Sequence, residues 1–175
     1  MRKIIGWIAL FSSFIAASIS ATGILYTHLQ PAIDAEKLLD LTRQARPVVI
    51  YVLVFTVVVS TITGVPWMWG RLANRKISDV LGPDPWYVQL SAILFVPALI
   101  DTVYTFFTKY APDTRLAGGK WVVCENFVKV PEAQAILFLW ANLRVYCGSV
   151  FMLALICFIM AYTMLARAPW TRDGY

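Results

Sequence analysis

The amino-acid sequence predicts an all-α membrane protein, a single domain over residues 1–175 that folds as an antiparallel bundle of four transmembrane helices. Hydrophobic residues make up 59% of the chain and charged residues only 14%, which gives more apolar surface than one soluble core of this length would bury. Four stretches reach the roughly 20 apolar residues that a helix needs to cross a bilayer. Polar segments separate these stretches and predict the loops.

The first predicted span covers residues 4–26. Its basic start resembles a signal peptide, but its apolar part is longer than the roughly 7 to 15 residues of such a signal. Small residues recur at every fourth position, which places them on one face of a helix and favours close approach of a neighbouring helix. We therefore predict a retained helix that packs through this small-residue ridge, formed by Ala9, Ser13, Ala17 and Ala21.

The second predicted span covers residues 48–69 and is rich in β-branched residues, as in "VVIYVLVFTVVV". In water this composition would favour a buried strand, but in lipid a helix satisfies its own backbone hydrogen bonds and a lone strand does not. Residues 28–47 before it are predicted as an outer loop. Part of that loop is expected to be helical, because four apolar residues are spaced loosely for one face, Ile33, Leu38, Leu39 and Leu41.

The third and fourth predicted spans cover residues 86–107 and 135–165. Pro85 suits the start of the third helix, where its missing N–H is not needed. Residues 108–134, between the two spans, are predicted as a long polar loop. The Gly118–Gly119 pair in that loop is interpreted as a turn, because "AGGK" lacks the spacing of a phosphate-binding loop.

Four spans place both termini on the same side of a membrane. Basic residues are equally numerous on the two sides, but those beside the termini and in residues 70–85 lie closer to the span ends, where the positive-inside rule acts most strongly. We therefore predict that both termini are cytoplasmic. The expected location is the plasma membrane or an endomembrane.

Several classes of function do not fit the composition. The fifteen lysines and arginines are scattered and form no run that would follow phosphates, so no nucleic-acid partner is expected. The three cysteines form no C-x-x-C motif, and the single histidine, His28, has no neighbouring carboxylate in the sequence and is expected to be solvated. We predict no metal and no cofactor. The expected partners are the lipid bilayer, a second copy of the chain and other membrane proteins.

Two ionisable residues lie inside apolar stretches, Asp101 and Arg144. Such residues are costly at the bilayer centre and usually face protein or each other. At about 1.5 Å per residue, Asp101 lies about 22 Å beyond Trp86 and Arg144 about 32 Å beyond Leu165 on the antiparallel helix. Both therefore fall in the outer half of the bilayer, and we predict a polar interhelical cluster rather than catalytic residues, formed by Asp101, Arg144, Tyr104 and Asn142.

The fourth span begins with a Gln-Ala pair that is followed by Phe-Leu-Trp, with a cysteine upstream: Gln134, Ala135, Phe138, Leu139, Trp140 and Cys124. With these residues it resembles fungal tetraspan proteins of the MARVEL type. The third span is similar in having an acidic residue followed by aromatics, Asp101, Tyr104 and Phe106. The resemblance implies a non-enzymatic four-helix protein with cytoplasmic termini that organises membrane microdomains or trafficking.

The sequence thus favours a non-enzymatic protein that acts by lateral association of its helices. The alternatives are a small membrane-embedded enzyme of the tailoring-oxygenase kind, acting on a lipophilic substrate, and an accessory subunit of a membrane complex. An enzyme requires a concave pocket of about 300 Å³ or more with convergent polar groups, opening near Asp101 and Arg144. An organising protein should be tightly packed there.

Overall fold

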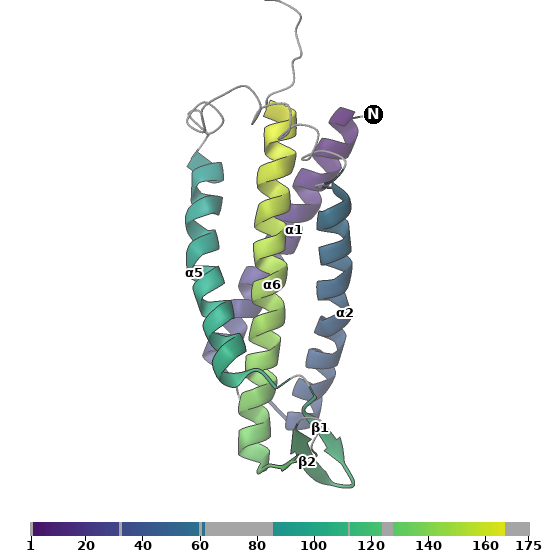
Figure 1. Cartoon of the computed structure of the whole chain (residues 1–175), viewed down its shortest axis with the longest axis vertical. Helices are drawn as coiled ribbons and strands as arrows, with labels where there is room; N and C mark the ends of the chain where they lie inside the picture. Colours follow the sequence, from purple (N-terminus) through teal and green to yellow (C-terminus); the bar gives the residue numbers. More distant parts are fainter. Residues whose placement is uncertain are drawn as a thin grey trace, which may run out of the picture.

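The structure, a computed structural model, is mostly helical and describes residues 2–31, 33–59, 61, 86–111, 113–123 and 128–166. Four helices dominate these segments, α1 (Arg2–Leu29), α2 (Ala35–Val59), α5 (Trp86–Lys109) and α6 (Glu132–Ala166) (Figure 1). Each is long and apolar enough to cross a membrane, which confirms the prediction of four helices of this kind. The predicted loop at residues 70–85, the end of the second span at residues 62–69 and Cys124 lie outside the described residues.

Helix α1 extends a few residues beyond the predicted span at each end. It stops where Gln30 adopts a φ of 42°, in the left-handed region that commonly ends a helix. The Gln30 N–H still donates to the carbonyl of Tyr26 at 3.2 Å. His28 therefore lies in the last turn of the helix.

Helix α2 begins at Ala35, well before the predicted start at residue 48, so the predicted boundary was wrong. The Asp34 carboxylate accepts a hydrogen bond from the Glu36 N–H at 3.4 Å, as a residue at the start of a helix does. Leu38 and Leu39 are buried on the first turns. Burial of this apolar face stabilises the helix through the charged segment, and Pro47 lies inside the helix rather than at its start.

The segment between α5 and α6 contains a small antiparallel sheet where a loop was predicted. Its strands are β1 (Arg115–Ala117), β2 (Lys120–Val123) and β3 (Val128–Lys129), in the order β1-β2-β3. The turn predicted at Gly118–Gly119 is confirmed: both glycines have positive φ, 57° and 73°, as a two-residue hairpin turn of the favoured kind requires. The sheet was missed because its strands are only two to four residues long.

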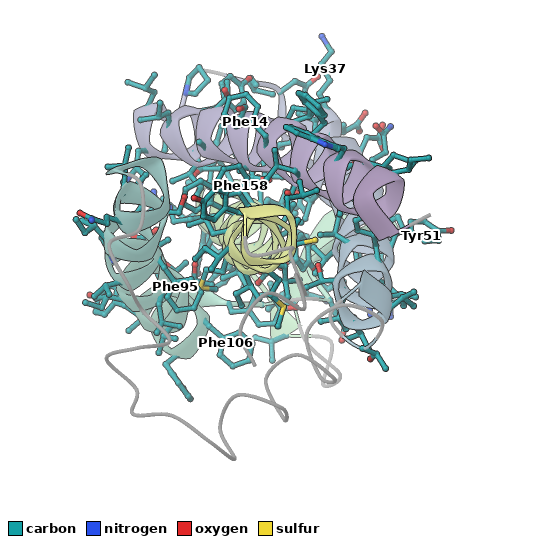
Figure 2. The ribbon with its side chains drawn as sticks, turned by 90° about the horizontal axis from the view of Figure 1, so that it is seen from above. Phe14, Lys37, Tyr51, Phe95, Phe106 and Phe158 are labelled. Carbon is teal, nitrogen blue, oxygen red and sulfur yellow. The ribbon has the colours of Figure 1, made fainter. Side chains whose placement is uncertain are left out.

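Helix α6 lies at the centre of the molecule and contacts α1, α2 and α5 (Figure 2). In its most apolar part half of the residues are buried, against fewer than a fifth in each of the other helices. A helix that is apolar on all sides is expected to be surrounded by others. The apolar composition of α6 therefore explains its central position.

Small residues set how closely the outer helices approach α6. A β-carbon built on Gly23 of α1 would lie 2.7 Å from Sγ of Cys147, so α1 and α6 meet there without room for a side chain. A β-carbon on Gly148 of α6 would clash with Thr102 of α5. These contacts are of the small-residue type that packs membrane helices.

The residues of the predicted ridge on α1 lie in two different environments. Its first half packs against α6: Ala9 lies with Cys157 and Ala161 in a buried cluster, and Ser13 is also buried, its hydroxyl donating to the carbonyl of Ala9 at 2.6 Å. The second half, Ala17 and Ala21, lies on a groove instead. The ridge therefore forms a close helix contact along only part of its length.

Candidate functional site: a groove with a polar end

Helices α1 and α5 leave a groove between them, with α6 as its floor. The groove has a volume of about 650 Å³, within the range of small-molecule sites. Most of its lining is apolar, contributed by α1 from Phe14 to His28, by α5 from Leu90 to Asp101, and by α6 from Phe151 to Phe158. From the sequence, tight packing was expected near Asp101 if the protein only organises membrane microdomains. The structure has an open groove there instead.

The α5 wall follows one face of the helix. Leu94, Pro97, Ala98 and Asp101 line the groove, and their spacing of three and four residues places them on successive turns of the same face. Asp101 therefore points to the groove because of its position in the helical repeat. It ends a wall that is otherwise apolar except for Ser91.

On α1 the hollow is formed by missing side-chain volume. Ala17 and Ala21 line the groove one turn apart, with Ser18 beside them. The neighbouring outward positions on the helix carry large side chains, for example Ile15 and Ile19, which are 57% and 69% exposed. Small residues of α1 therefore leave room for the groove at this level of the helix.

Three ionisable side chains from three helices meet at the polar end of the groove. Asp101 of α5 lies between His28 of α1 and Arg144 of α6, with Oδ2 3.7 Å from Nε2 of His28 and Oδ1 4.0 Å from Nη1 of Arg144. Both distances exceed the length of a hydrogen bond. The side chains are partly accessible, 49% for His28, 33% for Asp101 and 17% for Arg144.

Arg144 joins α6 to the end of α1. Its Nη2 donates to the carbonyl of Thr27 at 3.1 Å, one of the last carbonyls of α1, which have no partner within the helix. The C-terminal end of a helix also carries partial negative charge, which favours a cation there. Nε of Arg144 is buried without a hydrogen-bond partner among the described residues. The guanidinium therefore faces α1 on one side and Asp101 on the other.

The structure places the other two predicted cluster residues apart from this pair. Tyr104 is 62% exposed on α5, although it is only one turn from Asp101. Asn142 is 1% exposed and binds the backbone of Ala111, accepting from its N–H at 2.9 Å and donating to its carbonyl at 2.6 Å. Asn142 therefore fixes the chain that follows α5 to α6.

His28 is the residue of the site that sequence reasoning missed. It was expected to be solvated, and its side chain is indeed 49% exposed. What the sequence did not show is a carboxylate near it in space, that of Asp101. The available signal was depth: His28 ends the first helix and Asp101 lies in the same half of the third. Among the described residues, histidine, cysteine, aspartate and glutamate side chains form no group of three that could hold a metal ion.

Comparison of the chain with protein families, with curated proteins and with solved structures finds no match. The resemblance to MARVEL-type tetraspan proteins therefore stays a prediction from the residues that carry it. The groove and its polar end are the features on which a function can be argued.

Proposed function

We propose that this chain is an integral membrane protein with four antiparallel spans and cytoplasmic termini, and that the groove between α1 and α5 binds a lipophilic molecule. The observation that carries this proposal is the groove itself, about 650 Å³ lined mostly by apolar side chains and ending at Asp101 and His28. A site of this kind is expected to bind an apolar molecule and to orient it through a few polar contacts.

The direction of the groove supports an amphiphilic ligand. Phe14 and His28 mark its extent on α1, and fourteen residues at about 1.5 Å each span about 21 Å. In the proposed membrane the His28 end lies near the outer surface, because this residue is in the last turn of α1, and the Phe14 end lies towards the bilayer centre. A lipid in the outer leaflet has the same orientation, with its head at the surface and its chain inward.

The test is to fill the groove. Ala98 lines the groove on α5, about one turn before Asp101, and Ala98→Trp adds a large side chain there. Ile19 is 69% exposed on α1 and does not line the groove, so Ile19→Trp is a matched control. After purification in nanodiscs, native mass spectrometry should show an amphiphile bound to the wild type and to Ile19→Trp, and about tenfold less on Ala98→Trp. A folded Ala98→Trp variant that retains the same bound molecules would contradict the proposal.

A second candidate function is lateral association with another membrane helix, as the MARVEL-type resemblance implies. The observation that favours it is the uncovered half of the α1 ridge, where Ala17 and Ala21 would let a partner helix approach closely. The occupant of the groove would then be a second copy, an organised membrane protein or a larger complex to which this chain is an accessory.

Association is measured by counting copies of the fluorescently labelled protein in single nanodiscs or vesicles. Under the second candidate, Ala17→Leu should reduce association strongly. Ala16→Leu, one position away and not in the groove lining, should reduce it little. Equal association of both variants and the wild type would leave ligand binding as the function of the groove.

A further inference from the structure

We propose that the molecule bound in the groove has a neutral hydroxyl head group, which lies between the carboxylate of Asp101 and the imidazole of His28. This inference rests on the proposed function, because it names the class of ligand for the same groove. The class is a long-chain or polyisoprenoid alcohol or a similar hydroxylated lipophile. Its carboxylate, amine and plain hydrocarbon counterparts should bind less well.

One hydroxyl group can bridge Asp101 and His28 from beside the gap that separates them. The distance of 3.7 Å from Oδ2 to Nε2 is too long for a direct hydrogen bond and too short for an oxygen atom to lie on the line between the two atoms. An oxygen atom beside that line, about 2.8 Å from the carboxylate and about 2.9 Å from the imidazole, is at hydrogen-bond distance from each. A hydroxyl group can donate to Asp101 and accept from an N–H of His28 at the same time.

The charges around the gap favour a neutral head group. Arg144 approaches the other carboxylate oxygen, Oδ1, and already supplies a counter-charge for Asp101. The described residues that line the groove include one carboxylate and one imidazole but no lysine or arginine. An anionic head would therefore meet the carboxylate directly, and an ammonium head would bring a second cation to a carboxylate that Arg144 already neutralises.

The shape of the groove favours an extended chain behind the hydroxyl. It follows α1 for about 21 Å and α5, from Leu90 to Asp101, for about 16 Å, at about 1.5 Å per residue. Its ionisable residues, His28 and Asp101, come from the ends of these two walls. A single apolar chain can therefore run along the groove while its hydroxyl reaches the gap.

The experiment compares four probes that share one chain and differ in the head group. Hexadecanol, hexadecanoic acid, hexadecylamine and hexadecane, each with a photoreactive diazirine at mid-chain, are added to the full-length protein in nanodiscs, and the labelled α1 and α5 peptides are quantified. We expect about tenfold more labelling by the alcohol than by the alkane, the ratio that corresponds to about 1.4 kcal/mol. We expect less labelling by the acid and the amine than by the alcohol.

Two variants test whether the preference for the alcohol over the alkane depends on Asp101 and His28. Asp101→Leu should lower labelling by the alcohol to that by the alkane, and His28→Phe should lower the ratio of alcohol to alkane about threefold. His28 is half exposed at the end of its helix, so the His28→Phe variant is expected to fold. It therefore provides a test even if the Asp101→Leu variant does not fold. The control is Tyr51→Phe, because Tyr51 lies on α2 and is 73% exposed. This variant should leave the ratio of alcohol to alkane labelling unchanged.

The outcomes separate this inference from the proposed function. Equal labelling by alcohol and alkane, or stronger labelling by the acid or the amine, would overturn the inference and leave groove binding intact. An unchanged ratio in a folded His28→Phe variant would also overturn it. Failure of all four probes to label the groove peptides above the Ala98→Trp background would overturn the proposed function itself.

Discussion

Apolar surface is buried on one side of α6 and left open on the other. On one side the first turns of α2 and strand β2 close over the start of α6 and bury Leu38, Trp121 and Leu139. On the other side α1 and α5 stand apart, and the groove lies between them. Both sides are apolar in sequence, so apolar character does not distinguish them. One difference is side-chain volume at particular positions: Leu38, Trp121 and Leu139 fill the closed side, and small residues such as Ala17 and Ala98 lie where the groove is open.

The largest expected effect comes from opening the closed side. Leu139 has an exposed fraction of 0%, and Leu139→Ala should destabilise the protein by about 2 to 5 kcal/mol through lost burial and a cavity. Unfolding in denaturing detergent, followed by loss of helical circular dichroism, measures the change. Leu137→Ala is the control, because Leu137 is 55% exposed on the same helix and its truncation should cost about 0.5 kcal/mol or less. Equal costs at the two positions would refute the closed packing.

The next largest effect should come from the join between α6 and the chain after α5. Asn142→Ala removes both hydrogen bonds to Ala111 and leaves a buried N–H and carbonyl without those partners, which should cost about 1 to 3 kcal/mol. Hydrogen exchange of the Ala111 amide should rise with the loss of stability. An amide as protected as in the wild type would show that water or another group replaces the side chain.

A comparable effect is expected where α5 meets α6 most closely. Gly148→Ala should force Thr102 and its helix away from α6, and overpacking of this kind typically costs about 1 to 3 kcal/mol. Because the clash involves the Thr102 side chain, Thr102→Ala should relieve part of the cost. The double variant should therefore be more stable than the sum of the single changes, and a simply additive result would mean that the two residues do not touch.

The smallest effect should come from the ion pair at the polar end. Asp101 and Arg144 are 4.0 Å apart and both partly accessible, and pairs of this kind contribute about 0.2 to 1 kcal/mol. A double-mutant cycle with Asp101→Asn and Arg144→Gln measures this coupling. A coupling of several kcal/mol would mean that the pair contributes strongly to the stability of the fold. The polar end would then have a structural role, like the closed side, rather than a role in ligand binding.

Much of the helical content could be predicted from the sequence, because a long apolar stretch has few alternatives. The start of α2 could not, since Pro47 and the charges before it resemble a loop, and only burial of Leu38 against α6 shows that the helix begins at Ala35. The small sheet was likewise hidden in strands too short for a periodic pattern. Its Gly118–Gly119 turn was visible because glycine pairs have few other uses.

For the candidate site, the sequence could predict only the level of each residue along its helix. Counting residues put Asp101 and Arg144 in the same half of the bundle, and the structure places them 4.0 Å apart. Tyr104 was grouped with Asp101 because it is one turn away on the same helix, although its side chain is largely exposed. His28 was missed because its partner lies on another helix. The groove depends on the distance between α1 and α5, which no local pattern contains.

The central position of α6 has a consequence for biosynthesis. Among the described residues, α6 is the one helix that shares extensive contacts with α1, α2 and α5, and it follows them in the chain. At about 5 to 20 residues per second, the roughly hundred residues between α1 and α6 take on the order of ten seconds to translate. During that interval the earlier helices leave the ribosome without their main packing partner. Their packing against α6 can form only after the last helix is made.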